Sequence, residues 1–226
     1  MPRIEKYVGD NLEITYTGAP FAPIVLRAVS RMVVVPALPM NGKVTYSPQN
    51  LTGIVAFSYS ENNAAAGNRL TSLTFNSLQY VAESFNPFFM AALTSLSAPA
   101  LTTVGGSFNP SSMAALTSLS APALTTVGSI TISNLAALTT FTLGAPGTLK
   151  ALNGNFTATG CALNAASVNA ILASLVAMNG TNGTILYNRA ANGVNLSGGT
   201  SAAPTGQGIT DKATLNARTA GMCITN

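Results

Sequence analysis

The sequence has no histidine and no tryptophan, and only 7% of its 226 residues are charged, against about a quarter in soluble domains. Without an imidazole, catalytic triads that use histidine as the base and the commonest metal ligand are excluded. The 6 acidic residues show no paired spacing of the kind that glycoside hydrolysis uses. We therefore expect a protein that is not an enzyme, with no catalytic residue, metal or cofactor.

Positive charge is in slight excess but is not concentrated anywhere. The net charge is +4 and the pI is about 9.3, yet the 10 basic residues are scattered along the chain. Nucleic-acid binding requires a basic patch or stripe, so we expect no nucleic-acid partner. Residues 84–149 contain no ionisable side chain at all, so their solubility must come from Ser, Thr and Asn, or from a partner that covers them.

Long apolar runs are also missing. The most apolar window, Pro23–Pro39, contains Arg27 and Arg31 and is interrupted by Pro36, so it is too short and too charged to span a membrane. Residues 1–18 are polar and lack the apolar segment of a signal peptide. We expect no membrane span and no signal peptide. A chain without an export signal either leaves the cell inside an assembled particle or is not exported, so the expected location is a virion, with a bacterial cell surface or the cytoplasm as alternatives.

What the sequence does contain is a tandem repeat. Ser84–Gly106 reads SFNPFFMAALTSLSAPALTTVGG, and Ser107–Ser129 reads SFNPSSMAALTSLSAPALTTVGS. The copies differ only in that Phe88, Phe89 and Gly106 of the first are replaced by Ser111, Ser112 and Ser129 in the second. Weaker copies extend the pattern in both directions, and such a period is typical of a repeat architecture.

Each repeat is interrupted by Pro99 and the Gly105-Gly106 pair, which predicts short strands joined by turns. One coil cannot bury its own apolar residues, but stacked coils can. The predicted fold class is mainly β: a β-solenoid of about 23-residue coils, with a β-rich N-terminal region and a small α/β C-terminal cap. The predicted division is 1–60 for the capping or docking region, 61–158 for the solenoid and 159–226 for the cap.

Flanking elements follow from local patterns. Val168, Ile171, Leu172 and Leu175 have helical spacing, with Asn164 or Ser167 as the N-cap, and predict a helix over residues 164–178. A loop is expected over 189–208, a short helix over 211–218 and a last strand over 222–225. Short strands are expected in the N-terminal region at residues 12–16, 24–29, 32–35, 43–46 and 54–59.

The repeat unit LTSLSAPALTTVGGSFN, Leu93–Asn109, resembles leucine-rich repeats of the receptor L-domain kind. The segments from Ala162 to Asn188 and from Thr205 to Asn226 resemble the C-terminal closing segment of leucine-rich-repeat proteins of bacteria and phages. The resemblance implies a binding scaffold, and that scaffold serves many functions.

Two sets of residues are candidates for contacts with partners. Phe88 and Phe89, replaced by serine in the next copy, either pack under the N-terminal segment or form an exposed aromatic anchor, and Tyr80 is expected to extend the patch. The second set is a ladder of hydroxyls that either binds a ligand or only solvates the solenoid. Its members are Thr71, Thr94, Thr117 and Thr139.

Two cysteines, Cys161 and Cys223, lie in the C-terminal segment, and the sequence leaves open whether they form a disulfide or remain two buried thiols. We expect a non-enzymatic structural component of a phage virion: a capsid-decoration, head-fibre or tail-associated protein. Its partners would be other virion or surface proteins, with the chain in a homo-oligomer or larger assembly. The alternative is an adhesin that recognises a surface carbohydrate or protein.

Overall fold

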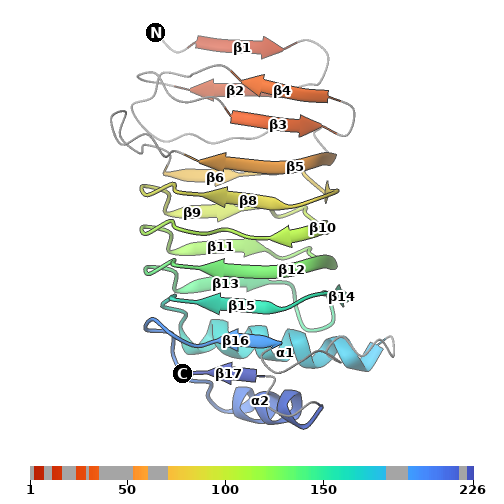
Figure 1. The fold of residues 1–226 in the computed structure, drawn as a ribbon, viewed down its shortest axis with the longest axis vertical. Coiled ribbons are helices and arrows are strands. Elements are labelled where there is room, and N and C mark those ends of the chain that lie inside the picture. The colour runs from red at the N-terminus through yellow and green to blue at the C-terminus, as the bar shows by residue number, and fades with distance from the viewer. Residues whose placement is uncertain are drawn as a thin grey trace.

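A computed structural model shows a stack of parallel coils that ends in two helices (Figure 1). It describes residues 3–7, 12–16, 24–28, 31–35, 53–60, 71–181, 193–218 and 223–226. The predicted mainly-β fold class, a solenoid with a small α/β C-terminal region, is confirmed. The strand predicted at residues 43–46 lies outside the described residues.

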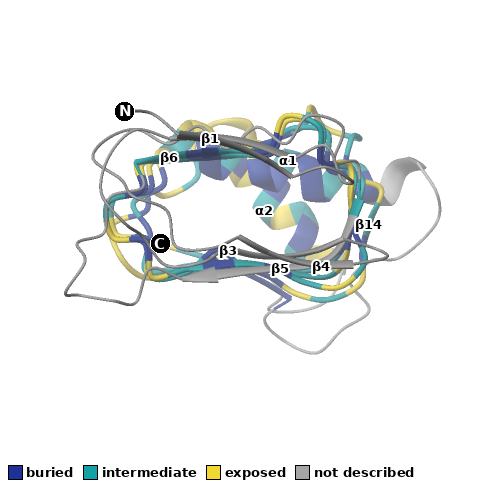
Figure 2. Cartoon of the chain, turned by 90° about the horizontal axis from the view of Figure 1, so that it is seen from above, coloured by how far each residue is buried: buried dark blue, intermediate teal, exposed yellow. Residues whose placement is uncertain are grey.

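Each full coil contributes to two parallel sheets that face each other across the interior (Figure 2). The smaller sheet has four strands: β6 (Ser72–Thr74), β9 (Ser95–Ser97), β11 (Ser118–Ala121) and β13 (Thr140–Leu143). The larger sheet takes from the coils β7 (Tyr80–Val81), β8 (Phe85–Phe88), β10 (Thr103–Phe108), β12 (Thr126–Ser133), β14 (Ala151–Leu152) and β15 (Phe156–Thr159).

The repeat period places equivalent residues side by side. Leu96 lies between Leu73 and Leu119 in the smaller sheet, so the apolar columns of the sequence become continuous buried columns. Phenylalanines stack in the same way: the rings of Phe85 and Phe108 are 5.4 Å apart and nearly parallel. Because adjacent coils supply each other's apolar neighbours, the core extends along the whole stack.

A bulge in β10 explains the glycine pair of the repeat. The register with β12 shifts between Val104 and Ser107, and Gly105 approaches the preceding coil so closely that a Cβ atom would collide with the carbonyl of Ala82. Only glycine allows this backbone contact.

The larger sheet continues into the N-terminal region. β5 (Gly53–Ser60) pairs in parallel with β7 and β8, and β3 (Ile24–Ala28) and β4 (Arg31–Val35) are then added antiparallel. A separate antiparallel hairpin contains β1 (Arg3–Tyr7) and β2 (Leu12–Tyr16). The described strands agree with four of the predicted ones, and β1 was not predicted.

The C-terminal region contains α1 (Ala165–Thr181), β16 (Val194–Leu196), α2 (Gln207–Arg218) and β17 (Cys223–Thr225). The first predicted helix is confirmed: its four apolar residues are buried, and Asn164 is the N-cap, accepting a hydrogen bond from the Ser167 N–H at 2.8 Å. No helix in the described part of the chain is long and apolar enough to cross a membrane.

Two details of this region correct the sequence prediction. Residues 189–208 are not all loop, because β16 joins the larger sheet between β15 and β17. The second helix begins at Gln207 rather than near residue 211. The glycine at 208 suggested a loop, but it lies where α2 packs closely against α1, since a Cβ atom there would meet the amide end of the Asn169 side chain.

Candidate binding surfaces

Phe88 and Phe89 lie where β8 ends and the chain turns towards the next strand. Phe88 is half-buried and Phe89 is 46% exposed, with ring centroids 5.5 Å apart in an edge-to-face contact. Of the two alternatives for this pair, the exposure of Phe89 favours an aromatic group that a partner can reach. A role in binding stays a prediction.

The backbone at Phe89 is unusual for a bulky residue, because its φ angle is +52°. The equivalent residues of the next coils share this left-handed conformation: Ser112 at +55°, Asn134 at +55° and Gly160 at +66°. The later coils thus use small or polar residues at a corner that disfavours bulky ones. Phenylalanine is retained at this corner despite both its backbone conformation and its exposure.

Asn86 is a third unusual residue at the same strand, and no pattern in the sequence pointed to it. It precedes Phe88 by two residues and shares its half-buried face of β8, while Phe85 and Pro87 point inwards. Its Oδ1 atom is the one buried side-chain polar atom of the described residues that has no hydrogen-bond partner. Such an atom costs about 1–3 kcal/mol. The next coil has the same Asn-Pro pair, so no difference in sequence singles Asn86 out.

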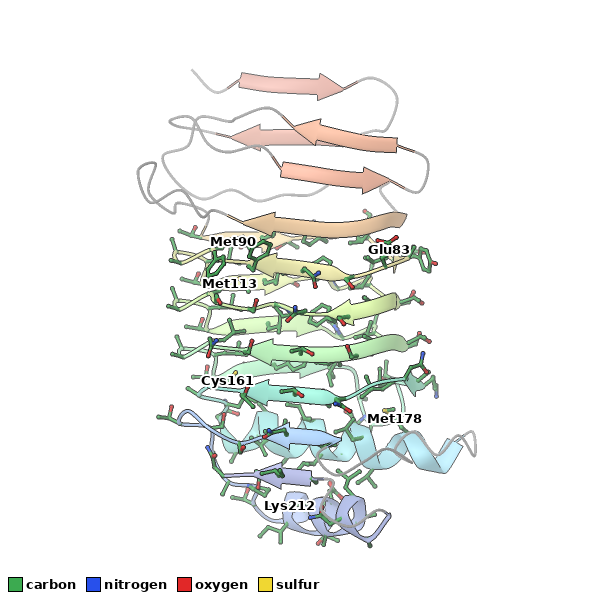
Figure 3. The ribbon with its side chains drawn as sticks, viewed as in Figure 1. Glu83, Met90, Met113, Cys161, Met178 and Lys212 are labelled. Atoms are coloured by element: carbon green, nitrogen blue, oxygen red, sulfur yellow. The ribbon has the colours of Figure 1, made fainter. Side chains whose placement is uncertain are left out.

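Tyr80 does not join this patch. It is opposite Gly53 on β5, whereas Phe88 is opposite Ser60 on the same strand. Seven residues of extended chain separate these positions by about 23 Å. Glu83 follows Tyr80 by three residues, and Met90 directly follows Phe89. Figure 3 shows Glu83 and Met90 towards opposite sides of the coil. Tyr80 is 43% exposed, so it is available for contacts, but at a different corner of the solenoid.

The predicted threonine ladder exists, and three of its four hydroxyls are already used within the fold. The Oγ1 of each of Thr94, Thr117 and Thr139 donates to the carbonyl oxygen of the threonine one coil before it, at 2.9, 3.0 and 3.3 Å. Thr102 and Thr125 form a second ladder of the same kind, which begins at the Gln79 carbonyl. These hydroxyls join successive coils, so they have no proton left to donate to a ligand.

Other hydroxyls are not used in this way. The outer face of the smaller sheet carries two columns of Ser and Thr, and within the described residues these eight side chains make no hydrogen bond. Each strand contributes two of them, in register with the next strand. The columns are Ser72, Ser95, Ser118 and Thr140, and Thr74, Ser97, Ser120 and Thr142. The alternation of these residues with buried Leu or Phe was visible in the sequence as SLT, SLS and TFT.

The two thiols of the C-terminal region are buried and do not belong to a candidate binding surface. Cys161 and Cys223 are both free and buried, and burial raises the pKa of each to about 11. They therefore stay protonated at neutral pH and are poor nucleophiles.

Chemistry elsewhere is sparse. Across residues 71–181, 193–218 and 223–226, no three His, Cys, Asp or Glu side chains gather where they could hold a metal ion. The polar groups of residues 84–149 are instead hydroxyls and amides, beside a few aromatic rings. Comparison with protein-family models, with curated proteins and with solved structures found no match to this chain.

Proposed function

We propose that the chain is a non-enzymatic structural component of a phage virion: a capsid-decoration, head-fibre or tail-associated protein that offers a rigid scaffold for contacts with other proteins. The observation that supports this most directly is the continuity of the larger sheet. It extends from the N-terminal strands through the coils to β17 without a break in strand order. A partner held at the N-terminal end would therefore be coupled rigidly to the coils.

The composition of the coils supports the same proposal. Residues 84–149 have no ionisable group, and an uncharged repeat surface suits contacts with neighbouring subunits better than contacts with nucleic acid. We also propose that the coils are related to leucine-rich repeats of the receptor L-domain kind, on the basis of the LTSLSAPALTTVGG pattern. Family membership would leave the choice of partner open.

The experiment is mass spectrometry of purified phage particles from the host that carries this sequence. The proposal predicts that the chain is present in particles at a fixed ratio to the major capsid or tail protein, and that it remains after washing in high salt. Its absence from intact particles, with the chain found only in the cell extract, would contradict the proposal.

An adhesin is the second candidate, and the Phe88–Phe89 corner is the observation that favours it. An exposed Phe89 with a positive φ angle, in contact with a half-buried Phe88 and on the same strand as an amide oxygen without a partner, is typical of a site kept for binding. The partner would be a surface carbohydrate or protein.

The test of the adhesin is the double substitution Phe88→Ser and Phe89→Ser, which copies the next coil. It should abolish binding to host cells without unfolding the chain. Tyr80→Ser is the matched control, since it removes an equally exposed ring at a distant corner. Unchanged binding by the double variant would rule out the aromatic corner as the anchor.

A further inference from the structure

One corner of the solenoid carries an asparagine followed directly by a glycine. Asn153 and Gly154 connect β14 to β15, and both strands pair in parallel with β12. Asparagine is among the thermolabile residues, and a following glycine has no side chain to hinder attack on the asparagine amide carbon. Within residues 71–178, no other asparagine precedes a glycine.

The side chain of Asn153 is exposed and unattached, although its backbone is held. The Asn153 N–H donates to the Val127 carbonyl at 3.1 Å, but the side-chain amide makes no hydrogen bond within the described residues. Other asparagines nearby are fixed: the Oδ1 of Asn164, for example, accepts from the Ser167 N–H at 2.8 Å. The amide carbon of Asn153 is therefore free to turn towards the backbone of the next residue.

The backbone nitrogen of Gly154 is also unattached. Its N–H has no hydrogen-bond partner among the described residues. Gly106 occupies the equivalent place two coils earlier, and there the N–H donates to the Glu83 carbonyl at 2.7 Å. A nitrogen held in this way cannot attack a side chain without first breaking its bond, whereas that of Gly154 can.

The difference between the two corners comes from the length of the preceding coil. Leu152 pairs with Val127, and Phe156 pairs with Ile130. Three residues separate Leu152 from Phe156, but only two separate Val127 from Ile130. The preceding corner therefore has no residue that corresponds to Glu83, and the Gly154 N–H is left without a carbonyl.

The fold also prevents a larger residue from replacing this glycine. A Cβ atom at position 154 would lie 2.9 Å from the Gly128 carbonyl oxygen and 2.9 Å from the Cβ of Ser129. Both contacts are too short for carbon. The close approach of two coils thus keeps glycine next to Asn153.

We propose that Asn153 is a site of spontaneous deamidation in the folded protein. The Gly154 nitrogen bonds to the amide carbon of Asn153, and the C–N bond of the side-chain amide breaks. The Gly154 proton leaves with the side-chain nitrogen as ammonia, and a succinimide ring is formed. One water then adds to either ring carbonyl and opens the ring, which gives aspartate or isoaspartate. No enzyme, oxidant or reductant takes part, and the reaction does not depend on the proposed virion function.

The two products change the corner differently. Aspartate keeps the backbone length and adds a negative charge beside residues 84–149, which have no ionisable group. Isoaspartate instead moves the side-chain methylene into the backbone between β14 and β15, whose positions on β12 are fixed. Because this corner already lies against the preceding coil, the longer backbone should loosen the strand pairing and lower the melting temperature.

The test is to keep the full wild-type chain in warm, mildly alkaline buffer and to follow the tryptic peptide Ala151–Arg189 by mass spectrometry. Fragmentation of the peptide locates the change from amide to carboxylate. The matched control is Asn153→Gln, whose amide would have to close a larger and less favourable ring. The proposal predicts that Asn153 is converted while Asn164 stays intact, and that position 153 of the glutamine variant does not change.

The same chain unfolded in guanidinium gives the rate of the bare sequence. The proposal requires that most of Asn153 is converted in the folded chain during the time that converts it completely in the unfolded chain. Survival of most of Asn153 in the folded chain would overturn it, as would faster conversion of Asn164. Aged wild-type protein should also melt at a lower temperature than fresh protein, whereas fresh Asn153→Asp should melt like the wild type. An equal loss in fresh Asn153→Asp would assign the effect to charge and contradict the role of the longer backbone.

Discussion

The left-handed corner at Phe89 allows the backbone cost of a bulky residue with a positive φ angle to be measured. A left-handed conformation costs a residue with a Cβ atom roughly 1–2 kcal/mol, while asparagine adopts it readily. Phe89→Ala and Phe89→Asn both remove the ring contact with Phe88, so they lose the same amount from it, about 0.5 kcal/mol at a half-exposed site. Only asparagine also relieves the backbone strain. Phe89→Asn should therefore be more stable than Phe89→Ala by about 1 kcal/mol.

For a chain of this size, about 1 kcal/mol raises the melting temperature by about 2–4 °C. The assay is thermal unfolding followed by circular dichroism, with urea unfolding as an independent measure of the free energy. Ser112→Asn and Ser112→Ala repeat the comparison one coil later, where φ is +55°. Equal stability of the asparagine and alanine variants at both corners would refute the argument. If Phe89 also anchors a partner, Phe89→Asn should stabilise the fold relative to alanine without restoring binding.

Three other substitutions or conditions test the solenoid itself. Leu119→Ala, at a fully buried position, should lower the free energy of unfolding by about 2–5 kcal/mol. Ser120→Ala, beside it on the outer face, should change the free energy of unfolding by less than about 0.5 kcal/mol. Similar losses for the two variants would contradict the assigned faces. Gly105→Ala forces a Cβ atom against the preceding coil and should cost about 1–3 kcal/mol in urea unfolding, so a neutral result would argue against the bulge. Because burial raises the pKa of Cys161 and Cys223 from 9.0 to about 11, unfolded chains lose these protons first, and stability should fall as pH rises from 9 to 11; a cysteine-free variant should show a flatter dependence.

The coils could be predicted because their signal is repeated. Leu96 and Leu119 recur at the same place in nearly identical units, so their burial follows from the need of each coil to cover its neighbour. The helix beginning at Ala165 was predictable for a similar reason, since Val168, Ile171 and Leu175 share one face. In both cases several residues carry the same information.

What could not be predicted depends on single residues or on contacts between distant segments. β16 has only three residues, and its pairing with β15 and β17 is not encoded locally. The separation of Tyr80 from Phe88 required the register along β5. The use of the threonine hydroxyls by the preceding coil depends on side-chain direction, which the repeat period alone does not give.

The central claim is that the repeat coils of this chain form a rigid solenoid scaffold. Small-angle X-ray scattering of the full wild-type chain over a wide concentration range, with light scattering of the same samples to give the mass, tests it most directly. A rigid scaffold predicts an elongated particle whose scattering curve agrees with the stacked coils. A curve typical of a flexible chain or of a compact sphere would contradict the claim.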